Sequence, residues 1–119
     1  MVKKMTLEEM IRRQMYFDSL HTSEKFDWDE QITIENIEVL EFLLLSLVGE
    51  VGEAANLVKK IVRGDFSLEE KKSEISEELT DIFIYLLKIS YQLNINLEEE
   101  YSKKMNKNME RFKNYERIK

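Results

Sequence analysis

Two pairs of acidic residues interrupt the most apolar part of this 119-residue chain, between positions 43 and 81. The first pair is Glu50 and Glu53, and the second is Glu78 and Asp81. A residue in a helix advances by about 100°, so a spacing of three places both carboxylates of a pair on one side of a helix. Such a placement constrains the fold, because burying a carboxylate costs free energy unless a cation meets it.

The helix faces that carry these pairs are otherwise apolar. The residues that project within about 20° of Glu50 on a helical wheel are Leu43, Leu57 and Ile61. The residues that share a stripe with Glu78 are Ile82, Tyr85 and Ile89. Glu50 and Glu78 are therefore predicted to point into a core, each with a second carboxylate beside it.

The remaining sequence predicts an all-α fold in one domain, residues 1–119. The chain has no proline and only three glycines, and helix-forming residues are abundant. We expect a four-helix bundle whose long central pair carries the acidic motifs.

Capping patterns divide the chain into four helices, with a loop over residues 21–31. Capping boxes at Thr6 and Ser67 predict helices that end near residues 20 and 93. The second helix is expected over about 34–63, with Gly64 as its C-cap. A similar cap at Asn96 opens the fourth helix, and the tail from Lys113 is polar.

Charge and cysteine content limit the partners and the compartment. The net charge of −6 argues against duplex nucleic acid as a partner. The chain has no cysteine, which favours a reducing, cytoplasmic environment. No apolar run reaches the length of a transmembrane helix or resembles a signal peptide, so no membrane partner is expected.

The acidic pairs can be interpreted in two ways. They can be solvated, or bonded to lysines across the bundle, as isolated pairs of this spacing often are. The metal-binding interpretation is favoured because the pairs occur on consecutive helices and on apolar faces. Oxygen ligands without cysteine or histidine suit Mg²⁺, with Mn²⁺ possible. A di-iron site is disfavoured, since the only histidine, His21, lies outside any Glu-x-x-His motif.

A metal site of this kind suits phosphoryl chemistry, which also needs cations from the protein. Lys104, Asn108 and Arg111 fall on one face of the fourth helix. Lys60 comes seven residues after Glu53 and projects near it. Any one of these lysines is more often simply solvated, but together they make sense as phosphate ligands.

The motifs resemble the all-α nucleoside triphosphate pyrophosphohydrolases, the MazG-like proteins, with dimeric dUTPases and dCTP pyrophosphatase as relatives. The hallmark of that family is E-x-x-E, a variable linker and E-x-x-D, which here fall at residues 50–53 and 78–81. Residues 103–108 are similar to the family's Lys-x-x-x-Asn segment. The resemblance extends from Trp28 to Arg111.

The resemblance implies hydrolysis of a nucleoside triphosphate to the monophosphate and pyrophosphate, for nucleotide-pool housecleaning with a pyrimidine or non-standard base. It implies Mg²⁺ held by the four acidic residues Glu50, Glu53, Glu78 and Asp81. It also implies a metal-activated water, with Glu50 or Glu53 as a catalytic group and Glu53 the preferred base. The triphosphate would be held by Lys104 and Asn108, and the chain would assemble as a homodimer or homotetramer.

Two aromatic residues are candidates for the nucleoside side of the site. Trp28 resembles a family tryptophan and could stack on a base or simply cover the core. Tyr85 matches a family tyrosine and could line the pocket or pack inside it. Two alternatives stay open: a non-catalytic helical module on the same bundle, and a phosphohydrolase for another phosphorylated metabolite.

Overall fold

The computed structural model describes residues 4–117, which form four α-helices and two short 3₁₀ turns. The helices are α1 (Leu7–Ser19), α2 (Ile37–Arg63), α3 (Leu68–Gln92) and α4 (Leu97–Arg111). The 3₁₀ turns are Ile34–Asn36 before α2 and Lys113–Tyr115 after α4. Within this part of the chain there is no β-strand, only an isolated bridge between Thr22 and Asp27. The predicted all-α, four-helix fold is confirmed.

Local chemistry sets the helix ends. Thr6 and Ser67 each accept a hydrogen bond from the backbone N–H three residues later, and the glutamate there bonds back to the cap. Asn96 caps α4 by accepting from the Glu99 N–H at 3.0 Å. Gly64 ends α2 with φ 93°, a left-handed conformation that glycine adopts without steric cost. All four caps were predicted.

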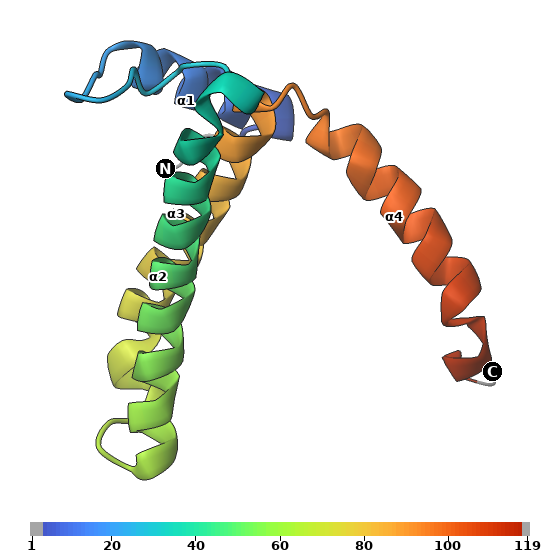
Figure 1. The fold of residues 1–119 in the computed structure, drawn as a ribbon. Helices are drawn as coiled ribbons and strands as arrows, with labels where there is room; N and C mark the ends of the chain where they lie inside the picture. Colours follow the sequence, from blue (N-terminus) through green and yellow to red (C-terminus); the bar gives the residue numbers. More distant parts are fainter. Residues whose placement is uncertain (1–3, 118–119) are drawn as a thin grey trace.

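The helices α2 and α3 form an antiparallel hairpin, and α1 lies across the end where α2 begins and α3 finishes (Figure 1). The hydrophobic core occupies this end of the hairpin. Its buried members are Ile32, Val39, Leu43 and Ile89, with Phe26, Leu40, Tyr85 and Leu93 packed against them. The loop before α2 therefore contributes to the core as well as connecting two helices.

The fourth helix turns away from the other three (Figure 1). Asn94 has a positive φ of 56° in the turn after α3, which redirects the chain. The apolar residues Tyr101 and Met109 of α4 are 65% and 63% exposed. The chain thus has the predicted helices, but within one copy α4 does not close the bundle and leaves its apolar side chains exposed.

No helix within residues 4–117 combines the length and apolar character that crossing a membrane requires.

Candidate active site

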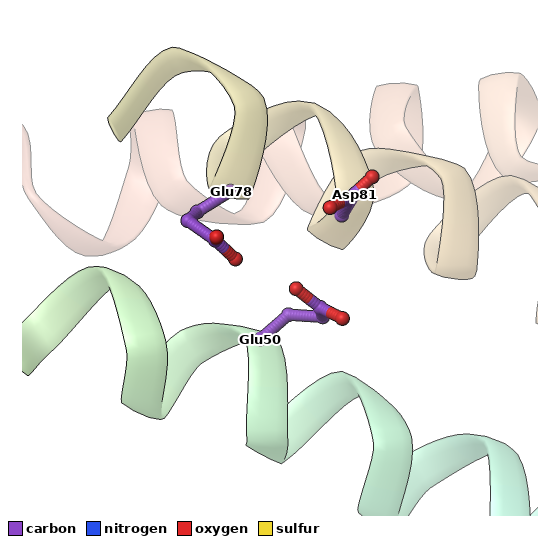
Figure 2. Close-up of side chains that lie close together, drawn as sticks. All are labelled: Glu50, Glu78 and Asp81. Carbon is purple, nitrogen blue, oxygen red and sulfur yellow. The ribbon is translucent and has the colours of Figure 1, made fainter. Parts of the chain in front are cut away.

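Three carboxylates converge halfway along the α2–α3 hairpin. Glu50 comes from α2, and Glu78 and Asp81 come from α3 (Figure 2). One oxygen of each lies within 4.8 Å of the oxygens contributed by the other two. Antiparallel packing brings the two acidic motifs to the same level, so residues 28 positions apart in the chain face one another. We call Glu50, Glu78 and Asp81 the acidic cluster.

The cluster has no internal counter-charge. Glu78 is half-buried, and its Oε2 is buried without a hydrogen-bond partner. The pKa of Glu78 rises from 4.5 to about 7, first because its side chain hydrogen-bonds to Glu50, then through burial and the proximity of Glu53. Within residues 4–117, no lysine or arginine forms an ion pair with any of these carboxylates.

Glu53 lies one turn after Glu50 and is more exposed. Its carboxylate is close enough to raise the pKa of Glu78, although it falls outside the tightest group of three. The structure therefore brings all four acidic residues of the two motifs to one place, with Glu53 at the solvent side.

These residues fit a hard divalent cation. Glu78 Oε2 is an orphaned acceptor, and an unpaired buried polar atom is costly unless a cation or water meets it. The surrounding ligands are all carboxylate oxygens, which Mg²⁺ and Mn²⁺ prefer. The geometry and the chemistry of the cluster fit a divalent cation with oxygen ligands.

A cavity of about 650 Å³ opens beside the acidic cluster and extends toward α1. Glu50 and Asp81 belong to both the cluster and the cavity wall. The aromatic residues that line the cavity are Phe17, Phe26, Trp28, Phe42 and Tyr85. An apolar, aromatic space that ends on carboxylates can accept a flat ring at one end and a metal-bound anion at the other.

Trp28 and Tyr85, the two aromatic site residues predicted from the sequence, both line this cavity and are half-buried. Trp28 is stacked on His21, with ring centroids 4.9 Å apart, and His21 lies 4.5 Å from the ring of Phe17. This aromatic layer fixes the orientation of the indole in an otherwise irregular loop.

The predicted phosphate ligands lie elsewhere. Lys104, Asn108 and Arg111 are all on α4, which leads away from the acidic cluster (Figure 1). Lys60 is on α2 beyond Glu53 and is not part of the cavity wall. Within one chain the structure does not bring these four side chains to the carboxylates.

Sequence reasoning missed a buried polar network at the α1 end of the cavity. Asp18 is 1% exposed and accepts hydrogen bonds from Gln14 Nε2 at 3.0 Å and from the hydroxyl of Tyr91. Lys88 Nζ lies 3.1 Å from Asp18 Oδ2 and also donates to the backbone carbonyl of Trp28. Burial, then the bond to Asp18, raise the pKa of Tyr91 well above its usual range.

The place of Lys88 in this network could have been predicted from the sequence. Lys88 follows Asp81 by seven residues, so it projects on the same face of α3 as the acidic motif and Tyr85. The place of Asp18 could not, because Asp18 is 70 positions away and only the packing of α1 on α3 brings it there.

The fold and site therefore define a helical hairpin in which an E-x-x-E motif of α2 faces an E-x-x-D motif of α3. The chain matches the MazG nucleotide pyrophosphohydrolase domain over residues 39–115. It belongs to that family, which confirms the resemblance seen in the two acidic motifs.

Individual relatives agree with this assignment. The chain is 35% identical over 75 residues to the Gene 37 protein of Mycobacterium phage L5, covering 61% of this chain and 66% of that protein. It is 31% identical over 111 residues to dCTP pyrophosphatase 1 of Rattus norvegicus, and 30% identical to that of Homo sapiens. Those alignments cover 90% of this chain and 59% of each relative, so the chain spans about three fifths of their length. No solved structure gives a significant match.

Proposed function

We propose that this protein hydrolyses nucleoside triphosphates to the monophosphate and pyrophosphate in a Mg²⁺-dependent reaction. The observation that carries the proposal is the buried, unpartnered Oε2 of Glu78 inside a group of three carboxylates at the edge of an aromatic cavity. Membership of the MazG family and the similarity to dCTP pyrophosphatases support the same reaction. We infer a pyrimidine or non-standard base as the preferred substrate, in nucleotide-pool housecleaning.

The acidic residues have separate roles in this proposal. Glu50, Glu78 and Asp81 would hold the cation, and Glu53 lies beside them. Mg²⁺ held by these residues would supply charge neutralisation at the phosphate oxygens and a more acidic water. Glu53, the most exposed of the glutamates on α2 near the cluster, accepts a proton from the attacking water. Trp28 and Tyr85 line the space for the nucleoside.

The phosphate-binding cations come from a second copy of the chain in this proposal. The cationic face of α4, with Lys104, Asn108 and Arg111, leaves its own acidic cluster, and its apolar stripe is exposed. A homodimer or homotetramer covers that stripe and can bring these cations to a partner's carboxylates.

The first experiment measures pyrophosphate release from a panel of ribo- and deoxynucleoside triphosphates with Mg²⁺ and with EDTA. We expect turnover that EDTA abolishes. Glu78→Gln should lower turnover by at least about a hundredfold, because it removes a carboxylate ligand of the metal that neutralises charge on the phosphates. Glu77→Gln, one residue earlier and exposed, is the matched control and keeps wild-type activity. Turnover in EDTA, or an active Glu78→Gln variant, would contradict the proposal.

The shared site is tested by mixing two impaired variants, at a substrate concentration well below the KM of Lys104→Ala. Lys104→Ala is expected to raise KM while leaving the urea midpoint unchanged, because Lys104 is exposed on α4. A mixture of Lys104→Ala and Glu78→Gln chains then regains activity, about a quarter of wild type for randomly mixed dimers with one intact site in each heterodimer. A mixture no more active than its parts would place the phosphate contacts within one chain.

A further inference from the structure

The end of the cavity opposite the acidic cluster is polar, and the reaction proposed above does not use it. Its wall contains Gln14, Asp18 and Lys88, beside the ring of Trp28. Lys88 Nζ lies 5.9 Å from the centre of that ring. The side chains of Lys88 and Asp18 are 9% and 1% exposed, so both are held in a fixed position instead of extending into solvent.

The hydrogen bonds of Lys88 leave one donor available. A lysine ammonium has three N–H groups. One donates to the carbonyl oxygen of Trp28, and the ammonium forms an ion pair with Asp18. Among residues 4–117 no further hydrogen bond to Lys88 is formed, and Lys88 lines the cavity with its Nζ near the ring of Trp28, so this ammonium can donate to a ligand there.

Both carboxylate oxygens of Asp18 have partners. Its Oδ1 accepts from Gln14, and its Oδ2 accepts from Tyr91 and pairs with Lys88. These donors fix the carboxylate, which in turn fixes the ammonium. The position of the Lys88 donor is thus set by contacts from both α1 and α3 before any ligand arrives.

The charge of the pair indicates what the free donor binds. Asp18 and Lys88 together are neutral, so this end of the cavity attracts a phosphate only weakly. A single directed N–H in an aromatic cavity instead suits a neutral, strongly polarised acceptor. The carbonyl oxygen of a nucleobase is such a group.

The spacing along α3 agrees with this assignment. Lys88 follows Asp81 by seven residues, about 10 Å along the helix axis at 1.5 Å per residue. A nucleotide whose phosphates lie at the acidic cluster can therefore extend through the aromatic part of the cavity and reach the polar wall with the far edge of its base.

We propose that Lys88, positioned by Asp18, is a specificity-determining residue that donates a hydrogen bond to a carbonyl at the far edge of the base and thereby favours the keto bases uracil and guanine over cytosine and adenine. The inference rests on the proposed function for its choice of a nucleotide as ligand. Adenine and cytosine carry an amino group at that edge, so they leave the buried N–H of Lys88 unpaired, which is the kind of mismatch that binding sites reject most strongly.

The test uses Trp28, the only tryptophan of the chain, as a fluorescent reporter inside the cavity. Deoxyuridine, deoxycytidine, deoxyguanosine and deoxyadenosine are titrated separately in EDTA, so that neither metal nor phosphate contributes. We expect the wild type to bind the two keto nucleosides, deoxyuridine and deoxyguanosine, at least about tenfold more tightly than deoxycytidine and deoxyadenosine. Lys88→Met weakens binding of the keto nucleosides by about ten- to hundredfold and leaves deoxycytidine and deoxyadenosine unchanged.

Two further variants separate recognition from folding. Lys88→Met leaves the buried Asp18 carboxylate without its cation, so the double variant D18N/K88M removes that charge while keeping partners for Gln14 and Tyr91. It should fold and show the same loss of base preference. Lys72→Met, an exposed lysine of the same helix outside the cavity, keeps the wild-type preference.

The proposal is overturned if the wild type binds deoxycytidine or deoxyadenosine as tightly as the keto nucleosides, or if no nucleoside changes the fluorescence of Trp28. It is also overturned if Lys88→Met or D18N/K88M weakens all four nucleosides equally, which is the result of a merely structural ion pair. A protein that shows the base preference but releases no pyrophosphate from any triphosphate would refute the proposed reaction and leave the role of Lys88 standing.

Discussion

Two charged side chains of α3 that are withdrawn from solvent, Glu78 and Lys88, lie about two to three turns apart in opposite electrostatic settings. Near the end of the helix, Lys88 pairs with Asp18, which also accepts bonds from Tyr91 and Gln14. Near its middle, Glu78 faces other carboxylates, and one of its oxygens is buried without a partner. The same helix thus has one group of charges that the fold satisfies and one that it does not.

The contrast separates charges that stabilise the fold from charges that await a ligand. A buried charge with good partners is strongly destabilising to disrupt. A group of like charges destabilises the fold until a cation binds. Removing a carboxylate should therefore have opposite effects at the two places, and the predictions below test that difference.

The largest effect is expected at the satisfied site. Asp18→Ala leaves Lys88 buried without its partner and removes the acceptor of Tyr91 and Gln14. The free energy of unfolding should fall by about 3–5 kcal/mol, measured by urea denaturation. Asp29→Ala, an exposed aspartate in the nearby loop, is the control and should change it little. An equal loss in both variants would show that the buried pair does not stabilise the packing of α1 on α3.

The next effect is stabilisation by metal at the unsatisfied site. Mg²⁺ at a hundred times its dissociation constant should raise the free energy of unfolding by about 2.7 kcal/mol, because it binds only the folded cluster. The stabilisation is measured by urea denaturation with and without EDTA. It should be largely lost in Glu78→Gln and kept in Glu77→Gln. A wild-type protein that is equally stable with Mg²⁺ and with EDTA would show that the acidic cluster does not await a cation.

Removing one carboxylate of the acidic cluster in the metal-free protein is expected to raise stability slightly, the opposite of the effect of Asp18→Ala. In EDTA at pH 8, Glu78→Gln relieves the repulsion from Glu50 and Glu53. Its urea midpoint should lie above that of the wild type, whereas Asp18→Asn should lower the midpoint. A lower midpoint for Glu78→Gln would mean that the fold itself uses this carboxylate.

The pH dependence of the metal-free protein gives the smallest signal. The pKa of Glu78 is about 7 in the folded protein and has an ordinary value of 4.5, so the folded state retains a proton that the unfolded state releases between these values. Stability should therefore fall as pH rises from about 4.5 to about 7 and level off above that range. The difference between wild type and Glu78→Gln, in urea titrations at several pH values with EDTA, isolates this group. A difference that is independent of pH would contradict the coupling of Glu78 to Glu50.

The sequence predicted the helices well because their signals are local. Thr6 and Ser67 form the predicted capping boxes, and Gly64 ends α2 as expected. The period of three to four residues also placed Glu50 and Glu78 correctly on facing, otherwise apolar surfaces. Each of these signals lies within a few residues of the chain, where steric and hydrogen-bonding preferences act without knowledge of the fold.

The polar wall of the cavity was not predicted, since its parts are distant in sequence. Lys88 looks like one more lysine in a charged helix until α1 brings Asp18 within 3.1 Å. The direction of α4 was also beyond the sequence. The apolar positions of α4 fit a bundle, but the structure places the helix away from its own hairpin (Figure 1).

The amino-acid sequence by itself determined the helix bounds, the two acidic motifs and their placement on opposing faces, because short-range geometry fixes all three. The tertiary structure decided which charges are satisfied. It buried Asp18 and Lys88 against one another, left Glu78 among like charges, and opened an aromatic cavity between them. The physical reason is that the free energy of a charge depends on what lies within a few ångströms of it, and packing sets those neighbours.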